Sequence, residues 1–206
     1  MQNGPMTAQQ QFERLVTLGV AELAGITDDE FRNLGHGLGD DGVVCVHPAL
    51  VPPSRLAPLL RHDGKPGFVV EDMTDLDEFA PIDPVQVPDR PLYLMRGVEI
   101  GENLTDWTPN AALPEILGQG QTPLTISEGI SWLLQEPGRL EANRCFMCAG
   151  SRKPTARGVD ARTPAVWISR GTGRDGRARR NAPKVGWCWA GNHHSWLGFA
   201  STNDRS

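Results

Sequence analysis

Glycine and proline interrupt this chain so often that long regular elements are not expected. The 206 residues include 23 glycines and 17 prolines, and both residue types are typical of turns and element ends. Four prolines, Pro81, Pro84, Pro88 and Pro91, follow one another closely and demand an extended connection, because proline fixes φ and has no N–H to donate. The pattern predicts short helices and strands joined by many turns.

The chain is nevertheless large and apolar enough to bury a core. Hydrophobic residues make up 39% of it, and a chain of this length predicts a single domain spanning residues 1–206. No apolar run approaches the roughly 18 residues of a membrane span, and the polar start, Met1–Gln11, has no signal-peptide pattern. We therefore expect no membrane partner and a cytoplasmic protein, whose four cysteines are thiols or ligands rather than disulfides.

Helical signals dominate the N-terminal part, about residues 7–40. Thr27 with Glu30 forms a capping box for a second helix, which begins with acidic residues that would repel DNA phosphates. We therefore expect a helical hairpin covering a sheet rather than a DNA-reading helix-turn-helix. The predicted helices are residues 8–24, a short helix with Phe31, Leu34 and Leu38, one starting at Ser54, residues 110–117, and residues 126–134 behind a Thr125/Glu128 capping box.

The C-terminal part, about residues 143–201, is rich in β-like runs. The overall pattern predicts an α+β fold, with N-terminal and central helices packed on a mainly antiparallel sheet and a C-terminal β-hairpin. An acidic loop-helix segment is expected at residues 71–79. The predicted strands are residues 43–47, 67–70, 92–98, 145–149, 165–169, 185–190 and 195–201.

The densest group of chemically active side chains lies in residues 186–196. Gly191-Asn192 fits a two-residue hairpin loop, with glycine where a type II′ turn needs positive φ. An aromatic face of this hairpin would be either core or a ligand-stacking wall, and a cysteine–histidine face either a nucleophile pair or an inert thiol. The alternation of a hairpin puts Trp187, Trp189, His194 and Trp196 on one face and Cys188 and His193 on the other.

Two cysteines have the spacing of half a zinc site. Cys145 and Cys148, together with Cys188 and either His193 or His194, would complete a set of three thiolates and one imidazole, with His193 the preferred histidine. Against this interpretation, residues 145–149 have the pattern of a buried strand, and the second half of the set lacks a paired spacing.

Charge is divided unevenly along the chain. Residues 1–138 contain 7 Lys/Arg and 21 Asp/Glu, whereas residues 139–206 contain 13 Lys/Arg and 4 Asp/Glu. Such asymmetry is typical either of a surface for an anionic partner or of two halves that neutralise each other within one fold. The net charge of −5 argues against a dedicated nucleic-acid binder.

Residues 170–184 form the most basic segment. Gly171–Gly176 matches the letters of a dinucleotide fingerprint, but Pro183 leaves no room for the helix that the fingerprint requires. We interpret the segment as a basic loop that is mobile unless an anion, a partner or the acidic half orders it. Its candidate phosphate ligands are Arg174, Arg177, Arg179 and Arg180, and Arg170 and Arg174 are candidate contacts of a small-molecule ligand.

Several runs resemble an uncharacterised bacterial family of about this length, a domain of unknown function. The resemblance covers most of the chain and implies no activity and no catalytic residues. The runs are Thr122–Thr125 with Glu128–Ile130, Asn143–Phe146, Ala165–Gly171, Pro183–Asn192 and Trp196–Gly198.

These observations favour a protein whose C-terminal Trp/His/Cys hairpin walls a pocket for an aromatic or anionic small molecule, as an enzyme or a ligand binder. In this hypothesis Cys188 and His193 are the catalytic candidates, and the tryptophans, His194, Arg170 and Arg174 contact the ligand. The alternative is a zinc-supported nucleic-acid or protein interaction module. The reaction, the cofactor and the oligomeric state are not defined by the sequence.

Overall fold

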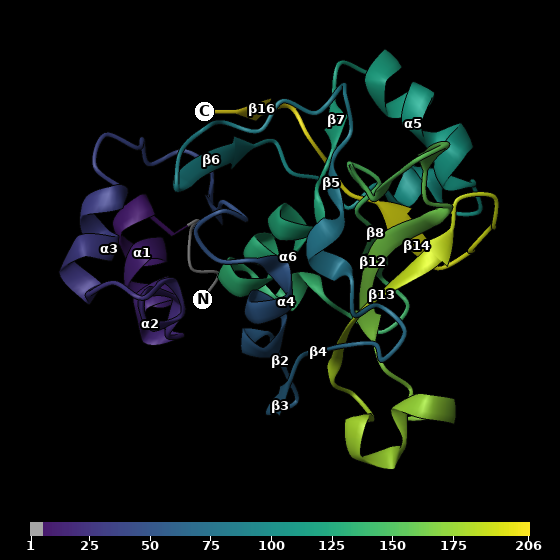
Figure 1. Ribbon diagram of the computed structural model, residues 1–206, viewed down its shortest axis with the longest axis horizontal. Helices are drawn as coiled ribbons and strands as arrows, with labels where there is room; N and C mark the ends of the chain where they lie inside the picture. Colours follow the sequence, from purple (N-terminus) through teal and green to yellow (C-terminus); the bar gives the residue numbers. More distant parts are fainter. Residues whose placement is uncertain (1–5) are drawn as a thin grey trace.

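Helix α6 (Ile126–Gln135) lies at the centre of the structure, a computed structural model that describes residues 6–206 (Figure 1). The predicted capping box begins this helix. Thr125 Oγ1 accepts a hydrogen bond from the Glu128 N–H at 3.3 Å, and Glu128 Oε2 accepts one from the Thr125 N–H at 2.7 Å. All ten residues of α6 are buried, so other elements must enclose the helix on every side.

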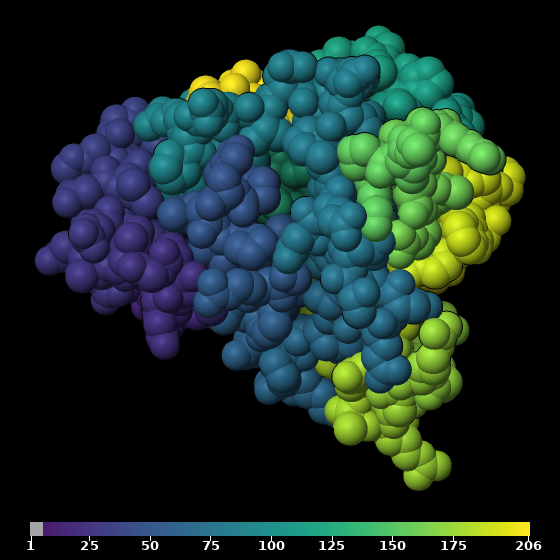
Figure 2. All heavy atoms as spheres, in the orientation of Figure 1, coloured from purple at the N-terminus to yellow at the C-terminus, as the bar shows by residue number. Residues whose placement is uncertain are grey.

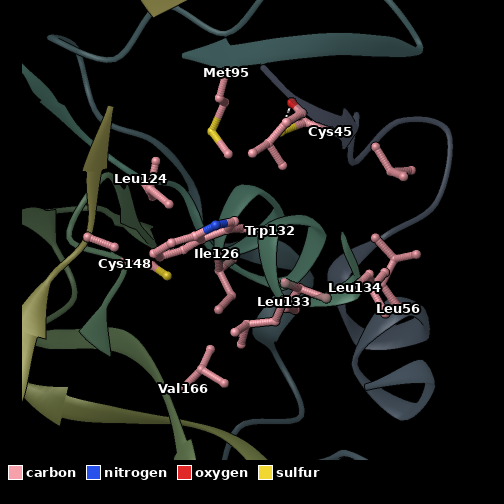
Figure 3. Close-up of a cluster of buried hydrophobic side chains, with 14 of the residues drawn as sticks. Cys45, Leu56, Met95, Leu124, Ile126, Trp132, Leu133, Leu134, Cys148 and Val166 are labelled. Carbon is pink, nitrogen blue, oxygen red and sulfur yellow. Dashed lines mark hydrogen bonds between the residues drawn. The ribbon is translucent and has the colours of Figure 1, made fainter. Parts of the chain in front are cut away.

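Apolar side chains from several elements enclose α6. The rings of Trp132 on α6 and Phe146 pack with their centroids 5.3 Å apart, and both residues belong to one hydrophobic core cluster. Burial of each such side chain contributes about 1.5–3 kcal/mol, so this cluster is the main source of stability. Figure 3 shows the α6 side chains Ile126, Trp132, Leu133 and Leu134 among Cys45, Leu56, Met95, Leu124, Cys148 and Val166.

A three-stranded antiparallel sheet packs against α6. It consists of β1 (Val43–Val46), β6 (Leu92–Arg96) and β16 (Asp204–Arg205), in the order β1-β6-β16. Every residue of β1 is buried, as its run of β-branched residues predicts. The Val46 N–H donates a hydrogen bond to Ser131 Oγ at 3.1 Å, which joins the strand directly to the helix.

A five-stranded sheet also packs against α6, in the order β14-β8-β12-β13-β4. Its inner neighbours are antiparallel, whereas the edge strands β14 and β4 run parallel to theirs. Because side chains alternate along a strand, Phe146 and Val166 face α6, while Cys145, Trp167 and Lys184 lie on the opposite face. The bounds are β4 (Phe68–Val69), β8 (Cys145–Met147), β12 (Arg162–Ile168), β13 (Pro183–Trp189) and β14 (Leu197–Phe199).

Short elements make up the remainder, as the frequency of glycine and proline predicts. Helix α5 (Pro109–Gly118) has ten residues. The others are α4 (Pro53–Leu56), β2 (Arg61–His62), β3 (Lys65–Pro66), β5 (Ala80–Pro81), β7 (Thr122–Pro123), β9 (Ser151–Arg152), β10 (Pro154–Thr155), β11 (Gly158–Val159) and β15 (Ser201–Thr202), with 3-10 turns at Ala57–Leu59, Leu76–Glu78, Glu102–Leu104 and Pro137–Arg139.

The N-terminal helices differ from the prediction in one respect. The helix expected over residues 8–24 is divided into α1 (Ala8–Thr17) and α2 (Val20–Ala24), because Gly19 adopts a φ of 86° and ends the first helix. The capping box of α3 (Asp28–Leu34) is confirmed, although Leu38 lies beyond its end. Helix α1 covers β1 as expected, since the Gln11 side chain accepts a hydrogen bond from the Val44 N–H at 2.8 Å.

The fold is α+β, as the sequence predicts. Each expected strand is present near its predicted position, and the segment expected at residues 71–79 contains one 3-10 turn, Leu76–Glu78. Among the residues that the structure describes, no helix is both long enough and apolar enough to cross a bilayer.

A buried ion pair joins the end of the chain to the start of α6. Arg205 on β16 donates through Nε to Glu128 Oε1 at 2.6 Å and through a terminal nitrogen to Glu128 Oε2 at 3.0 Å. The Tyr93 hydroxyl donates to the same carboxylate at 3.0 Å. The side chains of Glu128 and Arg205 are 0% and 5% exposed, so each charge depends on the other for stabilisation.

Glu128→Gln and Arg205→Met should each lower the free energy of unfolding by about 3–5 kcal/mol, because each leaves an uncompensated buried group. Urea denaturation followed by circular dichroism measures this loss. The double variant should lose less than the sum of the two single variants, since it removes both charges together.

Arg96→Met is the matched control on the neighbouring strand. Arg96 pairs with Asp204 at 2.8 Å, but the two side chains are 33% and 54% exposed, so its loss should cost about 1 kcal/mol or less. Equal losses for the Arg96 and Arg205 variants would contradict a special role of the buried pair.

Candidate functional site

The tryptophan-rich segment 186–196 does not form the predicted hairpin. Strand β13 pairs with β12 and β4. The next strand along the chain, β14, pairs with β8 and lies three positions away from β13 in the sheet. The Asn192 N–H donates to the Trp189 carbonyl at 3.0 Å in a turn, but Gly191 does not have the positive φ of a type II′ loop. The prediction fails because both edges of β13 are already paired, one with β12 and the other with β4, and the segment after the turn pairs with β8 instead.

The predicted aromatic face is therefore split into two separate pairs. Trp187 and Trp189 share a face of β13, with ring centroids 4.6 Å apart. His194 and Trp196 lie in the connection to β14, with ring centroids 5.8 Å apart. Trp196 also contacts Trp167 on β12, which was not a predicted site residue, with 6.3 Å between the ring centroids.

The predicted Cys–His nucleophile pair is not assembled. His193 Nδ1 lies 2.6 Å from the Asp106 carbonyl oxygen, and within the described part of the chain no hydrogen bond joins it to Cys188. Cys188 lies opposite Thr163 in the β12–β13 ladder. Burial raises the pKa of its thiol to about 12, whereas a nucleophilic cysteine needs a lowered pKa.

The predicted zinc ligands are not gathered into a metal site. Within residues 6–206, no group of three or more His, Cys, Asp and Glu side chains is arranged to hold a metal ion. Cys145 and Cys148 are free, buried thiols, the first at the start of β8 and the second directly after its end. Burial raises the pKa values of both thiols, that of Cys145 to about 11. The Cys-x2-Cys spacing therefore reflects a strand within the core, as Phe146 and Met147 between them suggested.

The basic segment 170–184 is ordered. It contains two 3-10 turns, Gly173–Asp175 and Arg177–Arg179. At its neck, the Asn181 N–H donates to the Ser169 carbonyl at 2.8 Å, which continues the β12–β13 ladder outward. Figure 2 shows this yellow-green segment packed beside blue residues of the N-terminal half, with its tip projecting at the lower right.

The acidic half supplies the contacts that order this segment. Arg174 lies 3.1 Å from an oxygen of Asp72, and Arg179 lies 3.9 Å from one of Glu71. The Arg179 guanidinium also stacks over the Phe68 ring, 4.4 Å from its centroid. Of the three partners expected to order the loop, the acidic half is the one that the structure shows, and it makes the segment a clamp between the two halves.

A cavity of about 510 Å³, which we call the tryptophan cleft, lies where this segment leaves the sheet, on the face opposite α6. Trp167 and Trp196 form its apolar wall, and Arg170, Arg180 and Lys184 are its cations. The lining residues are Ala142, Asn143, Cys145, Trp167, Ile168, Ser169, Arg170, Thr172, Asp175, Arg180, Asn181, Lys184 and Trp196. Of the predicted ligand contacts, Arg170, Arg180 and Trp196 line this cleft.

A smaller cavity of about 210 Å³, the side cleft, lies on the other side of Trp167. Trp187 and Arg174 line it, together with Glu71 and Asp72. Trp189, His194, Cys188 and His193 line neither cavity. The predicted site residues are therefore distributed among two cavities, the interior and the surface.

Asp175 organises the polar side of the tryptophan cleft. Its carboxylate accepts hydrogen bonds from Lys184 Nζ at 2.8 and 2.9 Å and from the Ser169 hydroxyl at 2.7 Å. Burial disfavours the charged form, but the hydrogen bonds from Lys184 and Ser169 and the charges of Lys184 and Arg179 outweigh it and lower the pKa of Asp175. Lys184 Nζ is thereby held 5.1 Å from the centroid of the Trp167 ring.

Gly186 holds Trp167 in its orientation. A Cβ atom at residue 186 would lie 2.6 Å from Cη2 of Trp167 and 3.1 Å from Cγ1 of Val70. The indole therefore crosses strand β13 directly over the glycine, in a space that any side chain would fill.

Arg170 and Arg180 lie near the two ends of the basic segment, and both line the tryptophan cleft. Gly171 has a φ of 70°, and a Cβ there would lie 2.5 Å from Cβ of Arg180. The glycine therefore allows the two ends of the segment to approach each other. The salt bridges of the segment use Arg174, Arg179 and Lys184. In the part of the chain that the structure describes, no carboxylate lies within 4.0 Å of the guanidinium of Arg170 or Arg180.

Trp167, Lys184 and Asp175 were not among the predicted site residues, whereas Arg180 was a predicted phosphate ligand. Trp167 and Lys184 are directly opposite in the β12–β13 register, so a correct strand pairing would have placed them together. The pairing crosses a 14-residue interval of loop, and no short turn signal indicated it.

The fold and the cavity define an α+β protein with a tryptophan-walled, arginine-lined cleft on one face of a five-stranded sheet. The chain belongs to the family of unknown function DUF5701, which it matches over residues 14–206. This confirms the expected resemblance to a family of unknown function. No match was found among curated proteins or among solved structures.

Native Cys188 should resist alkylation. With a thiol pKa of about 12, its thiolate fraction at pH 8 is on the order of a thousandfold below that of an exposed cysteine. Iodoacetamide labelling followed by peptide mass spectrometry should give a rate at least about a hundredfold lower in the native protein than in urea. Equal rates in the two states would show that the thiol is accessible and reactive.

Gly186→Ala should displace Trp167 and destabilise the protein by about 1–3 kcal/mol, as for an overpacked core position. Urea denaturation measures the loss. Gly191→Ala is the control, because a Cβ at residue 191 would meet no atom within 4 Å. Unchanged stability of the Gly186 variant would contradict the proposed close approach.

Proposed function

We propose that this protein binds a small planar anion in the tryptophan cleft. The observation that carries the proposal is the presence, in one cavity, of two tryptophans and of two arginines that pair with no carboxylate of the described chain. Aromatic side chains beside a few convergent polar groups are typical of small-molecule sites.

The tryptophan wall favours a flat ligand. Trp167 and Trp196 are both half-buried, and their rings meet edge to face at an interplanar angle of 77°. Indole rings offer large rigid surfaces that attract other aromatic groups by stacking or edge contacts. A cavity of about 510 Å³ lies within the range of about 300–1,000 Å³ for ligand pockets.

The cations favour a negative ligand. Lys184 is neutralised by Asp175 at 2.8 Å, so the positive charge of the cleft comes from Arg170 and Arg180. The planar guanidinium matches carboxylate and phosphate oxygens through two parallel hydrogen bonds. An anion bound here would supply the partners that these two side chains lack within the chain.

The possible nucleophiles of the cleft are engaged in other contacts, so the proposal is one of binding and includes no covalent step. The Ser169 hydroxyl donates to Asp175 at 2.7 Å. The Cys145 thiol lies 3.5 Å from the Glu141 carbonyl oxygen, and burial raises its pKa to about 11.

Isothermal titration with 2-naphthoate tests the proposal. The wild-type protein should bind this bicyclic carboxylate with one site per chain, and Arg170→Ala and Arg180→Ala should each weaken binding about tenfold to a hundredfold. This range follows from about 1.5–3 kcal/mol for a hydrogen bond to a charged group.

Arg177→Ala is the matched control, because Arg177 belongs to the same segment but does not line the cleft. Its variant should bind 2-naphthoate as the wild type does. Absence of binding to the wild type, or equal losses for all three arginine variants, would overturn the proposal.

A further inference from the structure

The distribution of ion pairs over the basic segment points to the charge of the ligand. The segment contains six cations: Arg170, Arg174, Arg177, Arg179, Arg180 and Lys184. Three of them are paired with carboxylates: Arg174 with Asp72, Arg179 with Glu71, and Lys184 with Asp175. The two that line the tryptophan cleft without a carboxylate partner in the described chain are Arg170 and Arg180.

The lining of the cleft therefore has a net charge of +2, since it contains three cations and one carboxylate, Asp175. A monocarboxylate would leave one of these positive charges uncompensated. A phosphate monoester has a charge of about −1.5 to −2 at pH 7, because its second pKa is about 6. It also has three terminal oxygens, which suffices for contacts to two guanidinium groups.

The positive charge does not continue outside the cleft as a stripe. Glu71 and Asp72 line the side cleft next to Arg174 and Arg179, and so neutralise the cations that would otherwise follow a long polyanion. Binding to nucleic acid needs several uncompensated cations along a surface. The arrangement thus suits one compact dianionic group.

We infer that the ligand of the tryptophan cleft is an aromatic phosphate monoester, with its phosphate between Arg170 and Arg180 and its ring against Trp167 and Trp196. This inference rests on the proposed function and makes it specific. It involves no bond making or breaking, only recognition of a dianion in preference to a monoanion.

Titration calorimetry with three matched probes tests the inference: 1-naphthyl phosphate, its methyl diester and 1-naphthoate. At pH 7.5 the monoester should bind at least about tenfold more tightly than the singly charged diester or carboxylate. Arg170→Ala and Arg180→Ala should each abolish this preference. Each variant keeps only one arginine without a carboxylate partner, so no cation remains for the second negative charge of the monoester. Arg177→Ala should retain the preference.

The pH dependence provides a second readout. Between pH 7.5 and pH 5 the monoester loses its second charge, since its pKa is about 6, and its affinity should fall about tenfold. The charged or titratable groups at the cleft are Arg170, Arg180, Lys184, Asp175 and Cys145, and His62 contacts Asn181 beside it at 2.9 Å. A carboxylate keeps its single charge over this range, so the affinity of 1-naphthoate should stay within about threefold, and a parallel fall for both probes would contradict the inference.

The outcomes separate the two proposals. Equal binding of the monoester, the diester and the carboxylate would overturn the dianion inference and leave the proposed function intact. Failure of all three probes to bind would overturn both. Salt-sensitive binding of a 20-base-pair DNA duplex at 150 mM salt, competitive with the monoester, would also overturn the inference, because the site would then accept a polyanion.

Discussion

The ion pair between Glu128 and Arg205 is the contact on which the architecture depends. Glu128 caps the first turn of a helix with no exposed face, and Arg205 is the penultimate residue of the chain. Because both charges are removed from water, the helix cannot occupy its buried position unless the C-terminal strand is also in place. The Tyr93 hydroxyl, which donates to Glu128 at 3.0 Å, extends this requirement to strand β6. One carboxylate thus connects the central helix with two strands of the three-stranded sheet.

The position of the tryptophan cleft follows from this centre. Helix α6 holds one face of the five-stranded sheet through residues such as Phe146 and Val166, and a strand whose alternate residues are fixed in the core cannot slip by one position without burying the wrong set. Trp167 and Lys184 are therefore fixed on the opposite face, directly across from each other in the ladder. Gly186 then leaves the space over which the indole lies. The apolar wall of the cleft is a consequence of packing on the far side of the sheet.

The features predicted from the sequence are those that depend on neighbouring residues. The capping boxes at Thr27 and Thr125 were found because the two partners of each are three residues apart and follow a simple chemical rule. The tryptophan-rich hairpin was a wrong prediction because Gly191-Asn192 is a plausible local turn, whereas both edges of β13 pair with other strands, β12 and β4, which no local signal indicates. The anchoring of the basic segment was equally hidden, since Asp72 and Arg174 are about 100 residues apart in the chain. Strand pairing and long-range ion pairs determine which residues line the cleft. Composition shows only that the chain contains both acidic and basic residues.

The uneven charge of the two halves has two explanations in the sequence, and the structure divides the cations between them. Arg205 pairs with Glu128, Arg162 with Asp75 at 2.6 Å, and Arg174 with Asp72, so much of the asymmetry is neutralisation between segments distant in sequence. Cations with such partners have a structural reason to be present. Arg170 and Arg180 have no carboxylate within 4.0 Å among the described residues, although both line the tryptophan cleft. Both side chains are exposed to water, so the fold does not require an internal counterion for them, and the proposed function assigns them to an anion that comes from outside the chain.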